Sequence, residues 1–129
     1  TDISTAFRTG RAALSAGNIT DALVQRDIII AEVKLMQAGM AIHYLNEVKS
    51  KIGNASQDAI NHSMSEALAF IIGIQFISED PDMSTAQITS IIDSIEPDIT
   101  GFTQSIVEIN NIINQIASAT GLESYKNIL

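Results

Sequence analysis

The sequence predicts an all-α protein, a mostly antiparallel bundle of about five helices formed by a single domain over residues 1–129. Three observations support this fold class. Apolar residues recur at steps of three and four along most of the chain, which is the period of a helix packed on one face. Glycines, prolines and Ser or Asn capping signals divide the chain at helical spacing. No segment keeps the strict alternation of a half-buried strand.

The first helix is predicted over residues 3–16. Phe7, Ala12 and Leu14 are its expected apolar contacts, and Gly17 is its stop because glycine readily adopts the left-handed conformation that ends a helix.

The second helix is predicted over residues 21–52, with Asn18 or Thr20 as its cap and Gly53 as its end. Its apolar residues follow alternating steps of four and three, which is typical of antiparallel helix packing. These residues are Val24, Ile28, Ala31, Leu35, Ala38, Ile42 and Leu45.

The third helix is predicted over residues 57–77 after a cap at Ser56. Its second half is apolar almost all round, so we expect it to be the central and most buried helix. An acidic turn with the helix-breaking Pro81 follows it.

A capping box at Ser84 to Gln87 begins a fourth helix that runs to Ile95. Pro97 breaks the chain again, and a fifth helix is predicted over residues 100–120. Its core stripe is Phe102, Ile106, Ile109, Ile113 and Ile116. Across the whole bundle, the residues that we expect to be buried are Leu35, Ile42, Ile71, Ile72, Ile109 and Ile113.

The composition narrows the classes of partner. The chain has 15 acidic and 7 basic residues, and the basic ones are scattered, so the positive patch that nucleic acid or an anionic membrane requires is missing. The sequence has no cysteine, which excludes disulfides and thiolate metal sites. The longest apolar stretch, residues 67–77, is far shorter than the roughly 20 residues of a membrane-spanning helix. We therefore expect no transmembrane segment.

The chain begins at Thr1 without a methionine or a signal segment. This start indicates that the domain is processed or cut from a longer precursor. A partner chain from that same precursor is therefore one candidate partner, beside a small ligand or another protein.

The main candidate site is a matched pair of motifs. His43 and Glu47 lie four residues apart, as do His62 and Glu66, so each pair shares a face of its helix. If the two helices form a hairpin that turns near residues 53–56, His43 lies level with Glu66 and Glu47 lies level with His62. These are also the only two histidines of the chain.

Three interpretations of this cluster remain open at the level of sequence. Each histidine donates a hydrogen bond to the glutamate opposite it, or the four side chains hold a zinc or iron ion, or the motifs face solvent. The spacing departs from the Glu-x-x-His pattern of di-iron bundles. Metal analysis of protein isolated without chelators would test the second interpretation.

Four segments resemble the C-terminal half of an imelysin-related bacterial family of unknown function. These segments are Phe7 to Ala13, Ala41 to Glu47, His62 to Phe70 and Ile116 to Leu122. The resemblance implies an all-helical, exported protein located in the periplasm or on the cell surface. It carries over only His62 and Glu66 as site residues.

The imelysin signature is Gly-x-His-x-x-Glu, and this chain departs from it. Ile60 stands where the glycine would be, and Glu66 comes one residue later than the signature requires. We therefore expect a non-catalytic imelysin-like domain that binds a ligand or metal, and the resemblance implies a role in iron or nutrient acquisition. The alternatives are a metal-dependent hydrolase of the imelysin peptidase type and a structural or interaction module of a larger assembly.

Overall fold

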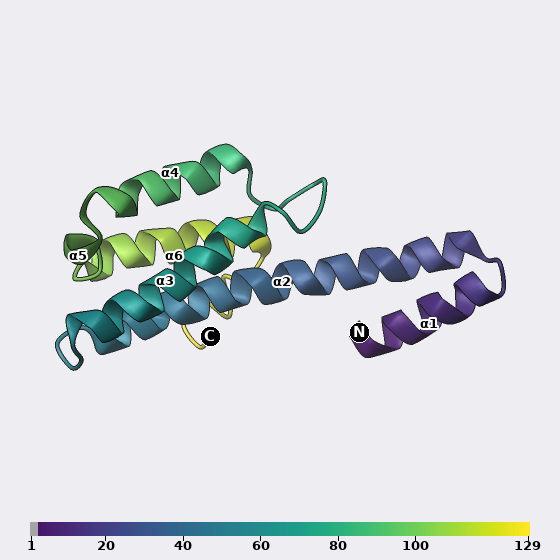
Figure 1. The fold of residues 1–129 in the computed structure, drawn as a ribbon, viewed down its shortest axis with the longest axis horizontal. Coiled ribbons are helices and arrows are strands. Elements are labelled where there is room, and N and C mark those ends of the chain that lie inside the picture. Colours follow the sequence, from purple (N-terminus) through teal and green to yellow (C-terminus); the bar gives the residue numbers. More distant parts are fainter. Residues whose placement is uncertain (1–2) are drawn as a thin grey trace.

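The structure is a computed structural model that describes residues 3–129, and the predicted all-α class is confirmed because every regular element over that range is a helix. The helices in chain order are α1 (Ile3–Ser15), α2 (Ile19–Lys51), α3 (Gln57–Ile74), α4 (Thr85–Ile95), the 3₁₀ turn η1 (Glu96–Asp98), α5 (Ile99–Phe102) and α6 (Ile106–Thr120). Successive long helices run in opposite directions (Figure 1).

The helix ends follow from local sequence signals. The side chains of Asn18, Ser56 and Ser84 each accept a hydrogen bond from a backbone N–H of the first turn, and Ser84 forms a full capping box with Gln87. Gly53 closes the α2–α3 turn at a φ of 76°, a region where a side chain is strained. The predicted capping box and glycine turn are therefore confirmed.

The fifth predicted helix is broken in two. Residues 103–105 separate α5 from α6, and the Ser105 side chain accepts a hydrogen bond from the Glu108 N–H to begin α6. Thr103 is fully buried at the break, and its hydroxyl donates to the Thr100 carbonyl and accepts from Gln57. These side-chain bonds satisfy polar groups that a continuous helix would pair internally.

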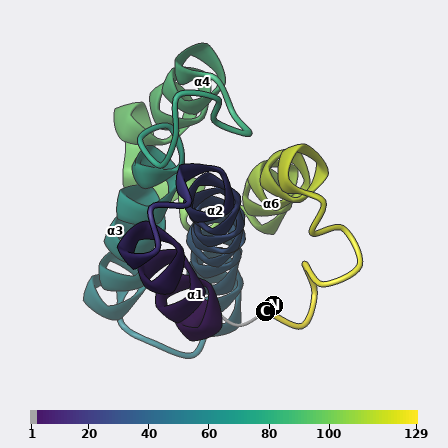
Figure 2. The same ribbon diagram turned by 90° about the vertical axis from the view of Figure 1, so that its right-hand side faces the viewer.

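Helix α2 is the helix that the others pack against, so the predicted central place of α3 is wrong. Helix α3 is still the more deeply buried of the two, with six buried residues of 18 against five of 33 in α2. With 33 residues, α2 is roughly 50 Å long at 1.5 Å per residue. It packs against α1 near one end and against α3 and α6 near the other. Viewed from the α1 end, α3 and α6 flank α2 on opposite sides (Figure 2).

Two parts of the molecule follow from this arrangement. We call α1 together with residues 19–33 of α2 the arm, and the rest of the described chain the bundle. The arm projects from the bundle, with α1 folded back along α2 (Figure 1). At the junction, Lys34 forms an ion pair of 3.1 Å with Asp82, which holds the α3–α4 loop against α2.

The core lies in the bundle and confirms four of the six residues that we expected to be buried. Ile42, Ile71, Ile109 and Ile113 are buried there. Leu35 and Ile72 are instead 44 % and 39 % exposed, so their predicted burial is wrong. Leu35 lies at the junction, while Ile72 points away from the core beside the buried Ile71.

The arm has almost no core of its own. Ala6 is the single buried residue of α1, and the first buried residue of α2 is Ala38, beyond the arm. Phe7 and Leu14, expected as packing contacts, are 60 % and 58 % exposed. Two helices bury only one narrow stripe between them, so some apolar side chains of the arm, such as Ile29 and Ile30, are half-buried and others, such as Leu23 and Val24, are exposed.

Candidate functional site

The two histidines of the paired motifs lie on exposed faces of α2 and α3. His43 packs edge-on against Tyr44, with ring centroids 5.4 Å apart, and His62 has no polar contact with any residue in the range 3–129. The predicted cross-helix hydrogen bonds from His43 to Glu66 and from His62 to Glu47 are therefore not formed.

The rotation of the two helices explains this outcome. The buried stripe of α2 includes Ile42, Leu45 and Val48, so His43 and Glu47 are each rotated by one residue from a buried position. The buried stripe of α3 likewise passes through Ser63 and Ala67 rather than through His62 and Glu66. The equal spacing from the turn sets the height of the motifs, but the side chains flank the helix contact.

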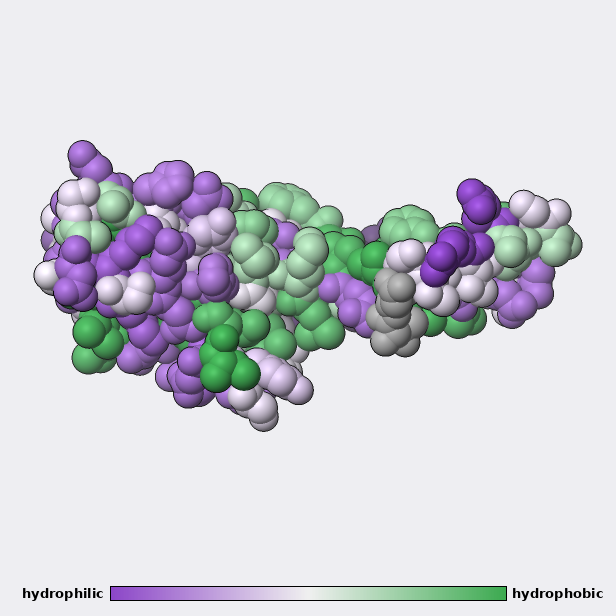
Figure 3. Space-filling view, turned by 90° about the horizontal axis from the view of Figure 1, so that it is seen from below, coloured by the Kyte–Doolittle hydropathy of each residue, from purple (hydrophilic) through white to green (hydrophobic). Residues whose placement is uncertain are grey.

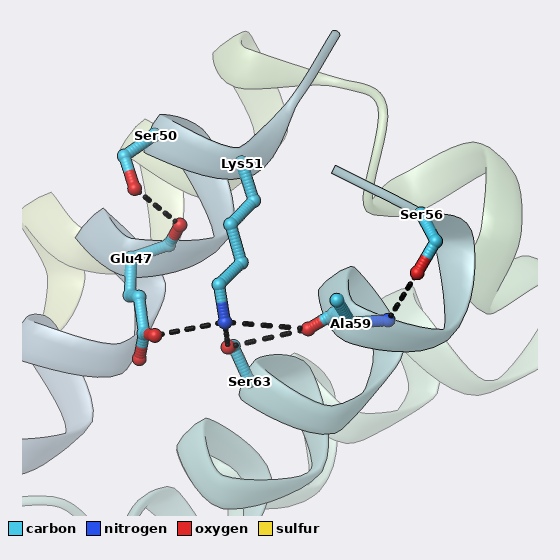
Figure 4. Close-up of polar contacts among 6 residues, drawn as sticks. All are labelled: Glu47, Ser50, Lys51, Ser56, Ala59 and Ser63. Atoms are coloured by element: carbon cyan, nitrogen blue, oxygen red, sulfur yellow. Dashed lines mark hydrogen bonds and ion pairs between the residues drawn. The ribbon is translucent and has the colours of Figure 1, made fainter. Parts of the chain in front are cut away.

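Glu47 has a different partner, Lys51, one turn further along α2 (Figure 4). The Lys51 ammonium lies 2.8 Å from a Glu47 carboxylate oxygen and donates to the Ser63 hydroxyl at 2.7 Å. Ser63 is buried on α3, and its hydroxyl donates to the Ala59 carbonyl. Lys51 therefore joins α2 to α3 beside their turn and satisfies a buried polar group.

This contact shifts the ionisation of Glu47. The hydrogen bond from Lys51 lowers the pKa of Glu47 below its ordinary value, the charges of Lys51 and His43 act in the same direction, and burial opposes them. A depressed folded-state pKa stabilises the fold above the unfolded-state pKa, and this contribution is lost as the pH falls through the folded-state pKa.

We therefore expect Glu47→Gln to lower the free energy of unfolding at pH 7 by less than about 1 kcal/mol, the range for partly exposed ion pairs. The difference from wild type should shrink as the pH falls through the lowered folded-state pKa of Glu47, because the carboxylate is then protonated in both the folded and the unfolded state. Denaturant unfolding at pH 7 and at a series of acidic pH values measures it. Glu66→Gln is the matched control, since Glu66 has no ion-pair partner among the described residues. A difference that stays constant with pH would contradict the role of the Glu47 charge.

No group of three or more His, Asp or Glu side chains in residues 3–129 is placed to hold a metal ion. His43, Glu47, His62 and Glu66 as ligands of zinc or iron therefore stay a prediction of the sequence, without support from the arrangement of these side chains. The two histidines follow the solvent-facing interpretation, and Glu47 is engaged by Lys51.

The arm carries the main concave apolar surface, which the sequence analysis missed. A groove of about 380 Å³ runs between α1 and α2. The side chains that matter most for its chemistry are Phe7, Arg11 and Leu14 on α1 and Arg26, Ile29 and Ile30 on α2. In the view of Figure 3, hydrophobic surface gathers over the junction between the arm and the bundle, and separate hydrophobic patches lie among hydrophilic ones on the arm itself. The sequence carried one signal of this groove: α2 has more apolar residues than a single buried face of a helix requires.

Helix α2 is also the one helix in the described range that is long and apolar enough to cross a membrane by length and composition. The longest apolar stretch of the sequence, residues 67–77, lies instead in α3 and just beyond its C-terminal end. Core helices of soluble proteins and signal sequences near an N-terminus meet the same two criteria, so this is weak evidence for a span. In this structure 28 % of the most apolar stretch of α2 is buried.

The fold and the groove together define a helical protein with a projecting two-helix arm. Residues 1–123 match the model of a protein family described as Domain of unknown function (DUF4856), and the chain belongs to this family. No curated protein and no solved structure matches the sequence. The family match makes no specific link to imelysin.

Proposed function

We propose that this chain is a non-catalytic binding domain that contacts its ligand or partner through the arm. The observation that carries the proposal is the exposed apolar groove between α1 and α2, with Phe7 and Leu14 along its edge. A contiguous apolar surface of this kind on a folded domain is typical of an interaction site. Each large apolar side chain that a partner covers fully contributes roughly 1.5–3 kcal/mol.

A binding role is better supported than catalysis. Hydrolysis by His43 or His62 would need an orienting carboxylate or a metal-bound water. Neither histidine forms a hydrogen bond or a close ion pair with a carboxylate in residues 3–129, although the charge of His43 acts on Glu47 from one helical turn away, and no metal-ligand cluster is formed over the same range. No contact in the described residues therefore supports the metal-dependent hydrolase, whereas the apolar groove of the arm supports an interaction module.

The cellular setting of this proposal comes from the sequence resemblance to imelysin-related proteins. Those proteins are exported, which supports a location in the periplasm or on the cell surface. A role in iron or nutrient acquisition would then rest on the arm recognising another component of the same system.

An apolar fluorescent dye with one sulfonate group, such as 8-anilinonaphthalene-1-sulfonate, tests whether the groove is a binding site. We expect the folded protein to bind the dye, and Leu14→Gln to weaken binding about tenfold, which corresponds to ~1.4 kcal/mol. Val107→Gln on α6 is the control, because Val107 is 71 % exposed but lies in the bundle. Equal dye binding by the two variants, or none by wild type, would refute the proposal.

A further inference from the structure

We propose that the groove of the arm binds an amphipathic helix of a partner protein, and that acidic residues flank the apolar stripe of that helix. This inference rests on the proposed function, because it names the partner of the same groove. Three features of the arm carry it: the shape of the groove, the spacing of its apolar side chains and the charge on its rim.

The shape fits a helix. The groove lies between two packed antiparallel helices, so a third helix would complete a three-helix arrangement with ordinary interaxial distances of about 8–10 Å. Helix α1 has 13 residues and is roughly 20 Å long, which matches a partner helix of about four turns.

The apolar side chains have the spacing of a helix-binding surface. Phe7 and Leu14 lie seven residues apart, so they are about 10 Å apart on the same face of α1. Between them, Gly10 approaches α2 closely: a Cβ at this position would lie 3.2 Å from the Gln25 Cβ. Across the groove, Ile29 and Ile30 line the α2 wall. Apolar anchors two turns apart on a partner helix match this spacing.

The charge on the rim selects the partner. Residues 3–15 contain Arg8 and Arg11 and no acidic residue, although the whole chain has a net charge of −8. Arg11 lines the groove between Phe7 and Leu14 and has no hydrogen bond or ion pair with any described residue. On the opposite wall, Arg26 is paired with its neighbour Asp27 in an exposed contact of 2.7 Å. Carboxylates on the partner would pair with Arg11, since guanidinium and carboxylate groups form charge-assisted bidentate hydrogen bonds.

The same charges disfavour two other occupants. If two copies of the chain paired groove to groove, both surfaces would carry the same arginines, and none of the described residues that line the groove is an acid that could pair with them. An anionic lipid surface would be repelled by the net charge of −8 that the whole chain carries.

Two designed helical peptides test the proposal on the full chain. Both carry leucines at helical spacing, and they differ only in whether glutamates or lysines flank that stripe. Fluorescence anisotropy should show the acidic peptide binding at least about tenfold more tightly than the basic one, with the difference shrinking at high salt. Equal affinities for the two peptides would overturn the proposal.

Two arginine variants locate the effect on the groove. Arg11→Gln should weaken binding of the acidic peptide about tenfold, which is ~1.4 kcal/mol. Arg8→Gln makes the same charge change on the same helix, but Arg8 does not line the groove, so it should weaken binding by less than about threefold. If the two variants had equal effects, the general charge of α1 rather than the groove would be responsible, and the proposal would be wrong.

Two further measurements address the other occupants. If the protein bound phosphatidylglycerol vesicles but not the acidic peptide, the ligand of the groove would be a membrane surface rather than a partner helix. A concentration-dependent dimer in sedimentation that disappears in Leu14→Gln would replace it with a second copy. If dye binding is retained and neither peptide is preferred, this inference fails while the proposed function stands. If the wild-type protein does not bind the dye, both this inference and the proposed function are refuted.

Discussion

Ile71→Ala should lower the free energy of unfolding by about 2–5 kcal/mol, the range for truncating a large buried aliphatic side chain. Ile71 is fully buried on α3 and packs in the single cluster of buried apolar residues that joins α2, α3, α4 and α6. The cost combines the lost burial of the removed carbons with the cavity that a close-packed core leaves behind. Urea unfolding followed by circular dichroism measures it.

The next residue provides the control for this prediction. Ile72→Ala is the same substitution on the same turn of α3, but the Ile72 side chain is 39 % exposed. We expect Ile72→Ala to lower the free energy of unfolding by about 1 kcal/mol or less. The Ile72 side chain is already partly exposed, so its truncation removes less buried apolar surface than truncation of Ile71. If the two substitutions lowered the free energy of unfolding equally, the face of α3 that carries Ile71 would not be the one that packs against the core.

Native-state hydrogen exchange should separate the arm from the bundle. We expect backbone amides in α1 to exchange through local opening, with opening free energies about 2–5 kcal/mol below those of α3 and α6. Ala6 is the only buried residue of α1, whereas α6 buries five of its residues. A helix of 13 residues is marginal in water without such packing.

The denaturant dependence of exchange gives a second measure of the same prediction. For amides in α1, the free energy of opening should depend only weakly on the denaturant concentration, because opening the arm exposes little buried apolar surface. The amides of α3 and α6 should show the full dependence of global unfolding. If α1 exchanged with the same free energy as α6, the arm would belong to the cooperative core, and its groove would not be a free surface.

The sequence determined the helices and most of their ends, because these depend on neighbouring residues. A capping serine, its partner three residues later and a glycine in the left-handed region act within a single turn. Ser84 with Gln87 and Gly53 were therefore readable without any tertiary information, and the structure confirms them. Most of the periodic stripe of α6 was readable for the same reason. The exception is Ile106 at the start of α6, which is 48 % exposed, so its predicted place in the core is wrong.

The tertiary structure alone decided which apolar and polar faces meet a neighbour. Periodicity predicted that Leu35 and Ile42 share a stripe of α2, but only the packing of the other helices decides that Ile42 is buried while Leu35 is exposed. The predicted hydrogen bonds from His43 to Glu66 and from His62 to Glu47 are not formed for a related reason. Counting residues from the turn set the height of His43 and His62, while the rotation of each helix, which all its core contacts fix together, turned both side chains to solvent.

The exposed groove of the arm could likewise not be located from the sequence, although the excess of apolar residues on α2 was visible there. The stripe of Phe7 and Leu14 is indistinguishable from a core stripe until the number of helices around it is known. That number depends on where distant segments of the chain pack, because burial is a property of the whole assembly of helices and not of one helix. Local interactions therefore determined the helices of this protein, and nonlocal packing decided which of their faces remain free to bind.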